Sequence, residues 1–169
     1  MTRAAIIVAD PPWRFASNSK AKPGRNAMRH YDCMTLPDIA DLPVAQWAAR
    51  DALLFLWATS PMLPQALSII PQWGFTYKSS FVWIKPHVAT GYWVRNRHEF
   101  VLLAKRGKFP CGRVAPFSDS VIEVPTRGHS RKPEELQDAI DGLWPAMPKL
   151  EMFARRTRPG WEVWGDEVG

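Results

Sequence analysis

The amino-acid sequence predicts an α/β fold with a mostly parallel, doubly wound sheet. Two runs, AAIIVA (4–9) and ALLFLWAT (52–59), contain no charged residue. Such continuous apolar runs are typical of strands that are buried on both faces of a parallel sheet. Segments with helical patterning alternate with the strands along the chain, as in successive βαβ units. A parallel sheet covered by helices on both faces follows from these observations.

Three segments between the strands predict helices. Helices begin at Ser, Thr or Asp caps and at prolines in the first turn, and they end at glycines. The expected helices are two short turns within 35–48, the first capped by Thr35, one helix over 60–74 with Ser60 as N-cap, and the clearest helix over 132–144.

The remaining strands are shorter or alternate between apolar and polar residues. Because the short turn RTRPG separates the last two, the final strand is expected to be antiparallel to its predecessor. These strands are expected over 75–85, 98–107, 121–125, 149–155 and 160–165.

Length and composition indicate one folded domain. The chain has 169 residues, of which 46% are hydrophobic and 22% charged, as in ordinary globular proteins. We therefore expect a single domain over residues 1–169 without a separate target-recognition domain. No run is apolar enough to span a bilayer and no signal peptide is evident, which predicts a cytoplasmic protein without a membrane partner. Cys33 and Cys111 are expected to be free thiols, and no metal-ligand spacing is present.

The distribution of charge indicates a polyanionic partner. The formal net charge is +6, and the three stretches 14–31, 104–113 and 126–132 are basic and contain no acid. Solvated loops usually mix both signs, so these stretches favour a face that binds nucleic-acid phosphates. The chain also has 9 tryptophans; several belong to the core, and a few are candidates for stacking on bases.

The tetrapeptide DPPW (10–13) follows the first predicted strand. One interpretation is a simple stop signal, because proline cannot continue a ladder. The other is a reaction centre, since ligands bind at the carboxyl ends of strands in open α/β sheets. An exocyclic amine of a base needs acceptors for both N–H bonds before its lone pair can attack. Asp10 supplies one, the carbonyl of Pro11 a second, Pro12 stiffens the backbone, and Trp13 stacks on a base that has left the duplex.

Together with other segments, this motif resembles the adenine-N6 methyltransferases related to the catalytic subunit of the eukaryotic mRNA adenosine methyltransferase. The resemblance extends over nearly the whole chain and indicates a compact prokaryotic or phage member. It is carried, in the family's order, by ADPPW (9–13), HYDCMTLPDIADLPV (30–44), ALLFLWATS (52–60), GYWVRNRHEFVLLAKRG (91–107), HSRKPEELQDAI (129–140) and KLEMFAR (149–155).

The resemblance implies a Rossmann-like fold of permuted motif order and S-adenosylmethionine as methyl donor. It implies that Asp10 and Pro11 hold the target amine, with Asp10 also next to the cofactor. Lys132 would reach the cofactor's carboxylate. The further cofactor contacts that it implies are Glu151, Phe153, Arg155 and Asp166, the last at a position where relatives often have Asn.

Substrate contacts are expected from the basic segments and the strand ends. The resemblance places Tyr31 in an active-site loop that begins with Arg14. Lys85 ends a predicted strand, and Arg95 and Asn96 offer donors in a basic context.

The substrate is expected to be DNA rather than RNA. An RNA enzyme, a catalytically inactive subunit and a cofactor-free binding module are the alternatives, and a homodimer or a partner subunit stays open. Asp10 argues against the inactive subunit, because inactive members lose this acid, and the SRKP and EMFAR blocks argue against the binding module.

Overall fold

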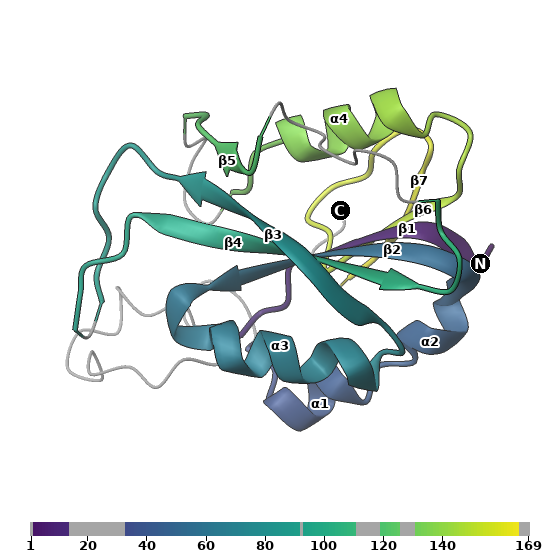
Figure 1. The fold of residues 1–169 in the computed structure, drawn as a ribbon, viewed down its shortest axis with the longest axis horizontal. Coiled ribbons are helices and arrows are strands. Elements are labelled where there is room, and N and C mark those ends of the chain that lie inside the picture. Colours follow the sequence, from purple (N-terminus) through teal and green to yellow (C-terminus); the bar gives the residue numbers. More distant parts are fainter. Residues whose placement is uncertain (1, 14–32, 92, 111–118, 126–130, 166–169) are drawn as a thin grey trace.

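The structure is a computed structural model that describes residues 2–13, 33–91, 93–110, 119–125 and 131–165. Its described strands form one seven-stranded sheet in the order β5-β3-β4-β2-β1-β6-β7 (Figure 1). The strands are β1 (Ala4–Ala9), β2 (Ala48–Thr59), β3 (Thr76–Ile84), β4 (His98–Arg106), β5 (Val121–Ile122), β6 (Lys149–Met152) and β7 (Trp161–Trp164).

The helices lie close to the predicted segments. They are α1 (Leu36–Ala40), α2 (Val44–Trp47), the 3₁₀ turn η4 (Ser60–Met62), α3 (Leu63–Gln72) and α4 (Glu135–Leu143). No helix among the described residues has the length and apolar character needed to cross a membrane.

Helices cover both faces of the sheet, which confirms the doubly wound α/β fold. In Figure 1, α1 and α3 lie on one side of the sheet and α4 on the other. Alternate side chains of a strand point to opposite faces, so Ile7 packs with the α1 and α3 side while Ile6 and Val8 pack with the α4 side. β1 and the charge-free part of β2, residues 52–59, are largely buried on both faces, as expected for strands inside the sheet.

The position of the antiparallel strand differs from the prediction. β1 is parallel to β2 and β6, and β3 is parallel to β5, but β4 is antiparallel to both β2 and β3. The predicted antiparallel final strand is wrong: β7 is parallel to β6, and Lys149 at the start of one pairs with Trp161 at the start of the other.

The reason lies in the connection over residues 153–160. β6 is only four residues long, which is roughly 13 Å at about 3.3 Å per residue. The eight residues of the connection can therefore lead the chain back from the end of β6 to the level of its start, where β7 begins. Ion pairs also hold the connection against α4, because Arg156 pairs with Glu134 and Arg158 pairs with Asp138 and Asp141. The turn residues RTRPG therefore cross over instead of closing a hairpin.

The start of the second helix also differs. Thr35 caps α1 as expected, since the Asp38 N–H donates to its Oγ1 over 3.3 Å. Ser60 is not the cap of a long helix: it begins η4, and α3 starts at Leu63. Pro64 has no N–H to donate to the Ser60 carbonyl, so Leu63 donates instead and the first turn is 3₁₀.

The topology gathers several strand ends at one edge of the sheet. Ala9 at the end of β1 pairs with Leu56 and Met152, near the ends of β2 and β6. Thr59 at the end of β2 pairs with Glu99 at the start of β4. We call this the carboxyl edge, where ligands bind in open α/β sheets.

Candidate active site

A buried carboxylate connects two lysines at the carboxyl edge. Glu99 is 4% exposed, and its two oxygens lie 2.6 Å from Lys85 Nζ and 2.7 Å from Lys132 Nζ. Glu99 belongs to β4, Lys85 follows β3, and Lys132 precedes α4. The three residues therefore join elements that are distant in sequence.

The two lysines also lie over indole rings. Lys132 Nζ is 5.5 Å from the centre of the Trp57 ring, and Lys85 Nζ is 5.2 Å from that of Trp83. The two rings meet edge to face, with centres 5.8 Å apart. Cation–π attraction and the shared carboxylate fix both ammonium groups in place.

These charges set the pKa of Glu99. Burial by itself would raise it, because the charged form is poorly solvated there. The positive charges of Lys132 and Lys85 outweigh this effect and lower the pKa of Glu99 below its ordinary value. Glu99 is thus a carboxylate at neutral pH.

Asp10 shares the second lysine with Glu99. Its Oδ2 lies 3.8 Å from Lys132 Nζ, and its side chain keeps 31% of its surface exposed. Burial under the surrounding protein raises the pKa of Asp10, and the negative charge of Glu99 adds to the rise. Lys132 and Arg155 act in the opposite direction. A carboxylate with a raised pKa beside a cation is typical of functional sites.

The DPPW turn is built by backbone hydrogen bonds. The Trp13 N–H donates to the Pro11 carbonyl over 2.8 Å, and the Met34 N–H donates to the Pro12 carbonyl over 3.0 Å. A carbonyl has two lone pairs, so Pro11 keeps one acceptor position beyond this turn. The two prolines thus orient their carbonyls rigidly next to Asp10.

Trp13 lies differently from its predicted role. It is 4% exposed and packs in the core, and its Nε1 donates to the Trp57 carbonyl over 3.3 Å. In this arrangement the indole supports the DPPW turn from the core side. Stacking on a base stays a prediction, and it requires the ring to become uncovered.

A second polar pair lies on the neighbouring strand. Glu151 of β6 accepts a hydrogen bond from Gln137 Nε2 of α4 over 3.2 Å. Burial raises the pKa of Glu151. Gln137 is 8% exposed, and its Oε1 has no hydrogen-bond partner in the described part of the chain. A buried acceptor without a partner normally indicates a missing donor.

The backbone beyond Glu151 is tightly shaped. Phe153 has a φ of 61°, which is unusual for a residue with a side chain. The Trp164 carbonyl accepts from the N–H groups of both Phe153 and Ala154. A Cβ on Gly165 would lie 2.9 Å from the Ala154 nitrogen, so only glycine allows this approach.

This set of groups fits the cofactor that the sequence implies. Its amino-acid end carries an ammonium and a carboxylate, which match Asp10 and Lys132 respectively. Its ribose carries hydroxyl donors, which match the carboxylate of Glu151 and the unpartnered Gln137 Oε1.

The structure brings some of the predicted site residues together and separates others. Asp10, Lys85, Lys132 and Glu151 lie at the carboxyl edge, and Arg95 and Asn96 lie on the connection between β3 and β4. Arg14, Tyr31 and Asp166 lie outside the described residues, as do the stretch 15–30 and residues 126–130.

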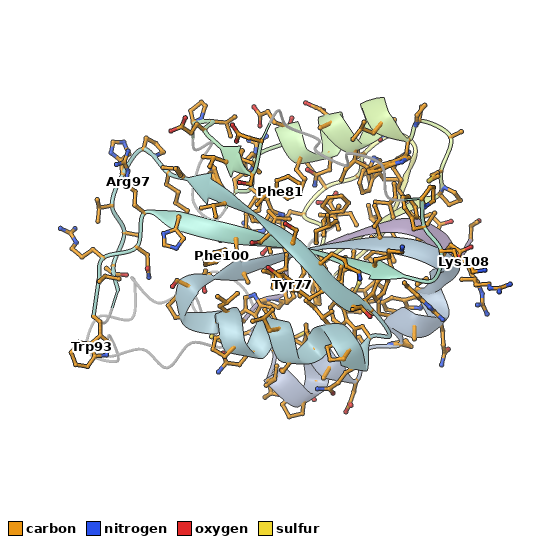
Figure 2. All side chains as sticks on the ribbon, in the orientation of Figure 1. Tyr77, Phe81, Trp93, Arg97, Phe100 and Lys108 are labelled. Atoms are coloured by element: carbon orange, nitrogen blue, oxygen red, sulfur yellow. The ribbon has the colours of Figure 1, made fainter. Side chains whose placement is uncertain are left out.

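One basic stretch lies at the opposite edge. Arg106 pairs with Ala52 near the start of β2, and Lys108 donates its N–H to Asp51. Lys108 and Trp93 lie at opposite ends of Figure 2. Residues 105–108 therefore do not join Asp10 in one phosphate-binding face, because β4 runs antiparallel and carries its end away from the site.

Sequence reasoning missed Glu99 and Gln137. Glu99 had a signal: it is a charged residue within the apolar strand HEFVLL (98–103), and such a charge is costly unless it is paired. Gln137 had none, because a glutamine on a helix is ordinarily solvated.

Comparisons with known proteins show which proteins the chain is similar to. The chain is 32% identical to the type II methyltransferase M.MunI of Mycoplasma sp over 96% of this chain and 77% of that protein. It is 32% identical to the N6-methyladenosine RNA methyltransferase MTA1 of Cryphonectria parasitica over 96% of this chain. It is 26% identical to the N(6)-adenosine-methyltransferase catalytic subunit METTL3 of Homo sapiens over 97% of this chain.

The chain spans 51% of MTA1 and 28% of METTL3. The family model described as MT-A70 matches residues 4–167, which include every element described above. The chain therefore belongs to the MT-A70 family.

Proposed function

We propose that this protein transfers a methyl group from S-adenosylmethionine to the exocyclic N6 amine of adenine in nucleic acid. The observation that carries the proposal is Asp10 at the end of β1, in a rigid DPPW turn and 3.8 Å from Lys132. The relatives named as adenosine N6-methyltransferases support the same activity.

The chain's own groups orient the amine. The Asp10 carboxylate accepts one N–H of the amine, and the open acceptor position of the Pro11 carbonyl takes the other. Both hydrogen bonds draw the nitrogen lone pair out of conjugation and towards the methyl donor. S-adenosylmethionine, when bound, supplies the electrophilic methyl group. The amine releases its proton after the transfer, so no general base is required beforehand.

Residues around Asp10 bind the cofactor in this proposal. Lys132 binds the carboxylate of the cofactor, and Glu151 and Gln137 accept hydrogen bonds from its ribose hydroxyls. Phe153 and Arg155 are further cofactor contacts in this proposal. Asp166, outside the described residues, remains a proposed contact from the sequence.

DNA is the substrate that we propose first, with RNA as the alternative. The match covers 77% of M.MunI, which is named as a type II methyltransferase. It covers only 51% of MTA1, named as an RNA methyltransferase, and 28% of METTL3, named as an adenosine methyltransferase. Arg14, Tyr31, Lys85, Arg95 and Asn96 stay the proposed substrate contacts. The single-domain organisation, the cytoplasmic location and a homodimer or partner subunit also remain proposals.

Labelled cofactor with matched duplex DNA, single-stranded DNA and RNA, followed by nucleoside analysis, tests the activity. We expect labelled N6-methyladenine in DNA above RNA. Label in RNA alone would reverse the substrate order, and no label in any nucleic acid would refute the activity.

The variant Asp10→Ala tests the assigned role. We expect methyl transfer to fall below detection, because the amine loses its charged acceptor. Calorimetry should still detect cofactor binding, since Lys132 and Glu151 remain. Turnover retained in Asp10→Ala would refute the role of this carboxylate.

A further inference from the structure

The described residues of the connection between β3 and β4, 85–91 and 93–97, form a projecting arm, which we call the β3–β4 arm. Its two sides are joined by backbone hydrogen bonds: the Lys85 N–H donates to the Arg97 carbonyl over 2.8 Å, and the Ala89 N–H donates to the Asn96 carbonyl over 2.7 Å. The Arg97 side chain adds a bond to the Lys85 carbonyl over 3.0 Å. The arm is therefore a built feature of the fold.

The arm carries large apolar side chains in water. Trp93 is 99% exposed, Val94 is 69% exposed and Val88 is 48% exposed. Figure 2 shows Trp93 at the far tip, pointing away from the body of the protein. A single exposed apolar residue is ordinary, but three on one arm indicate a contact surface.

The backbone of the arm requires glycine at position 91. A Cβ on Gly91 would lie 1.9 Å from the Val94 carbonyl oxygen and 3.2 Å from Asn96 Nδ2. The backbone can therefore close between Gly91 and Val94 only because Gly91 has no side chain.

The charge of the arm identifies the class of partner. Residues 85–97 include Lys85, His87, Arg95 and Arg97 and no acidic residue. Arg95 is exposed and forms no ion pair with any residue that the structure describes. An aromatic ring beside unneutralised arginines suits a base and the phosphates next to it.

The end of the arm nearest the sheet, at Lys85, belongs to the candidate active site. Lys85 binds Glu99, which binds Lys132 beside Asp10. Backbone hydrogen bonds join the two sides of the arm from Lys85 to Ala89, and Trp93 lies beyond these bonds at the far end of the arm (Figure 2). A strand with its adenine at Asp10 would thus meet Trp93 at a flanking nucleotide.

We propose that Trp93 stacks on an unpaired base that flanks the target adenine, while Arg95 contacts the phosphate beside that base. This inference rests on the proposed function. It assigns the β3–β4 arm as a contact for a single-stranded or locally opened nucleic-acid strand.

Equilibrium binding of a fluorescein-labelled single-stranded DNA tests the stacking. Alanine substitution at a stacking position typically weakens binding by about tenfold, so we expect that loss in Trp93→Ala. Trp93→Phe should stay within about threefold of the unchanged protein, because a phenyl ring still stacks. The slope of affinity against salt should not change in Trp93→Ala, because no charge is removed.

Val94→Ala is the comparison variant: Val94 belongs to the same exposed apolar surface, but its side chain cannot stack on a base, so its loss removes only a small apolar contact. We expect it to bind within about twofold of the unchanged protein. All variants should keep the melting temperature and cofactor affinity. Unchanged DNA affinity in Trp93→Ala would overturn the inference. Equal losses of DNA affinity in Trp93→Ala and Val94→Ala, together with a lower sedimentation mass, would also overturn it. That result would show that the arm forms a contact between two copies of the chain.

The methylation assay separates the two proposals. If the unchanged protein methylates nucleic acid and Trp93→Ala binds equally well, only the inference fails. If the protein binds nucleic acid through Trp93 but methylates none, the proposed function fails while the contact stands. No binding of nucleic acid at all would overturn both.

Discussion

Asp10 and Glu99 share one ammonium group, but their pKa values shift in opposite directions. Lys132 lies 2.7 Å from Glu99 and 3.8 Å from Asp10. The closer contact and the second cation, Lys85, lower the pKa of Glu99, whereas burial raises that of Asp10. Burial and the neighbouring charges together therefore determine the pH at which Asp10, the proposed acceptor of the amine, ionises.

A pair of variants at these positions tests this electrostatic arrangement. In the proposed mechanism Asp10 must be ionised to accept the amine, so activity should fall as the pH drops through the raised pKa of Asp10. Glu99→Gln removes a charge that raises the pKa of Asp10, so the acidic limb of kcat/KM should move to lower pH. Lys132→Gln removes a charge that lowers this pKa, so the limb should move to higher pH.

The readout is the pH of half-maximal kcat/KM in each variant, and not the activity at one pH. Dividing each pH profile by its own maximum removes the effect of any loss of cofactor affinity in Lys132→Gln. Shifts in the same direction for both variants would contradict the arrangement.

At the scale of elements, α4 and the connection 153–160 are joined by a polar cluster around Asp141. The Asp141 carboxylate accepts from Arg158 over 3.0 Å and from Trp161 Nε1 over 2.9 Å, and lies 3.6 Å from the buried Lys149. Asp138 contributes only an exposed pair with Arg158.

We predict that Asp141→Ala strongly destabilises the protein. It leaves the Lys149 ammonium, 3% exposed, without its carboxylate, and such a loss costs about 3 kcal/mol. Asp138→Ala is the matched control and should cost less than about 1 kcal/mol, because its side chain is exposed. Urea denaturation gives both free energies of unfolding. Equal effects of the two variants would show that the cluster does not hold the connection.

Two glycines provide a second test at this scale. Gly165→Ala should lower the free energy of unfolding by about 1–3 kcal/mol, since its Cβ would lie 2.9 Å from the Ala154 nitrogen and 3.1 Å from its carbonyl oxygen. Gly142→Ala in α4 meets nothing within 4 Å and should raise stability by up to about 1 kcal/mol. Thermal and urea unfolding measure both changes. A neutral Gly165→Ala would show that the backbone at Ala154 can move aside.

At the scale of the whole molecule, basic residues lie at both edges of the sheet, whereas the candidate active site lies at the carboxyl edge. Arg95 belongs to the arm at the carboxyl edge, and Lys108 follows β4 at the opposite edge. A charge near the binding site releases counterions from nucleic acid, and a distant one releases few.

The salt dependence of DNA affinity should distinguish these two positions. Affinity should fall steeply with salt in the unchanged protein. Arg95→Ala should reduce the slope of log affinity against log salt by about 1, and Lys108→Ala should leave it unchanged. Binding titrations at several salt concentrations give the slopes. A reduced slope in Lys108→Ala would show that the strand reaches the opposite edge.

Local rules predicted most elements, and their successes and failures have physical causes. β1 was predicted at its observed bounds because a charge-free run ends at a carboxylate and two prolines. The start of α3 was misplaced because Pro64 removes one N–H, a detail that cap preferences do not weigh. The direction of β7 was wrong because it depends on ion pairs to α4, and partners so far along the chain leave no local pattern.

The sequence by itself determined the α/β class, the buried charge-free runs 4–9 and 52–59, and the placement of Asp10 and Lys85 at strand ends. These properties follow from apolar runs and turn residues, which act within a few positions of the chain. Only the tertiary structure decided that Glu99 binds both lysines, that Trp13 lies buried, that Lys108 lies away from the site and that Trp93 projects from the arm. These outcomes depend on strand direction and on pairing between distant segments, which are set when the whole sheet packs.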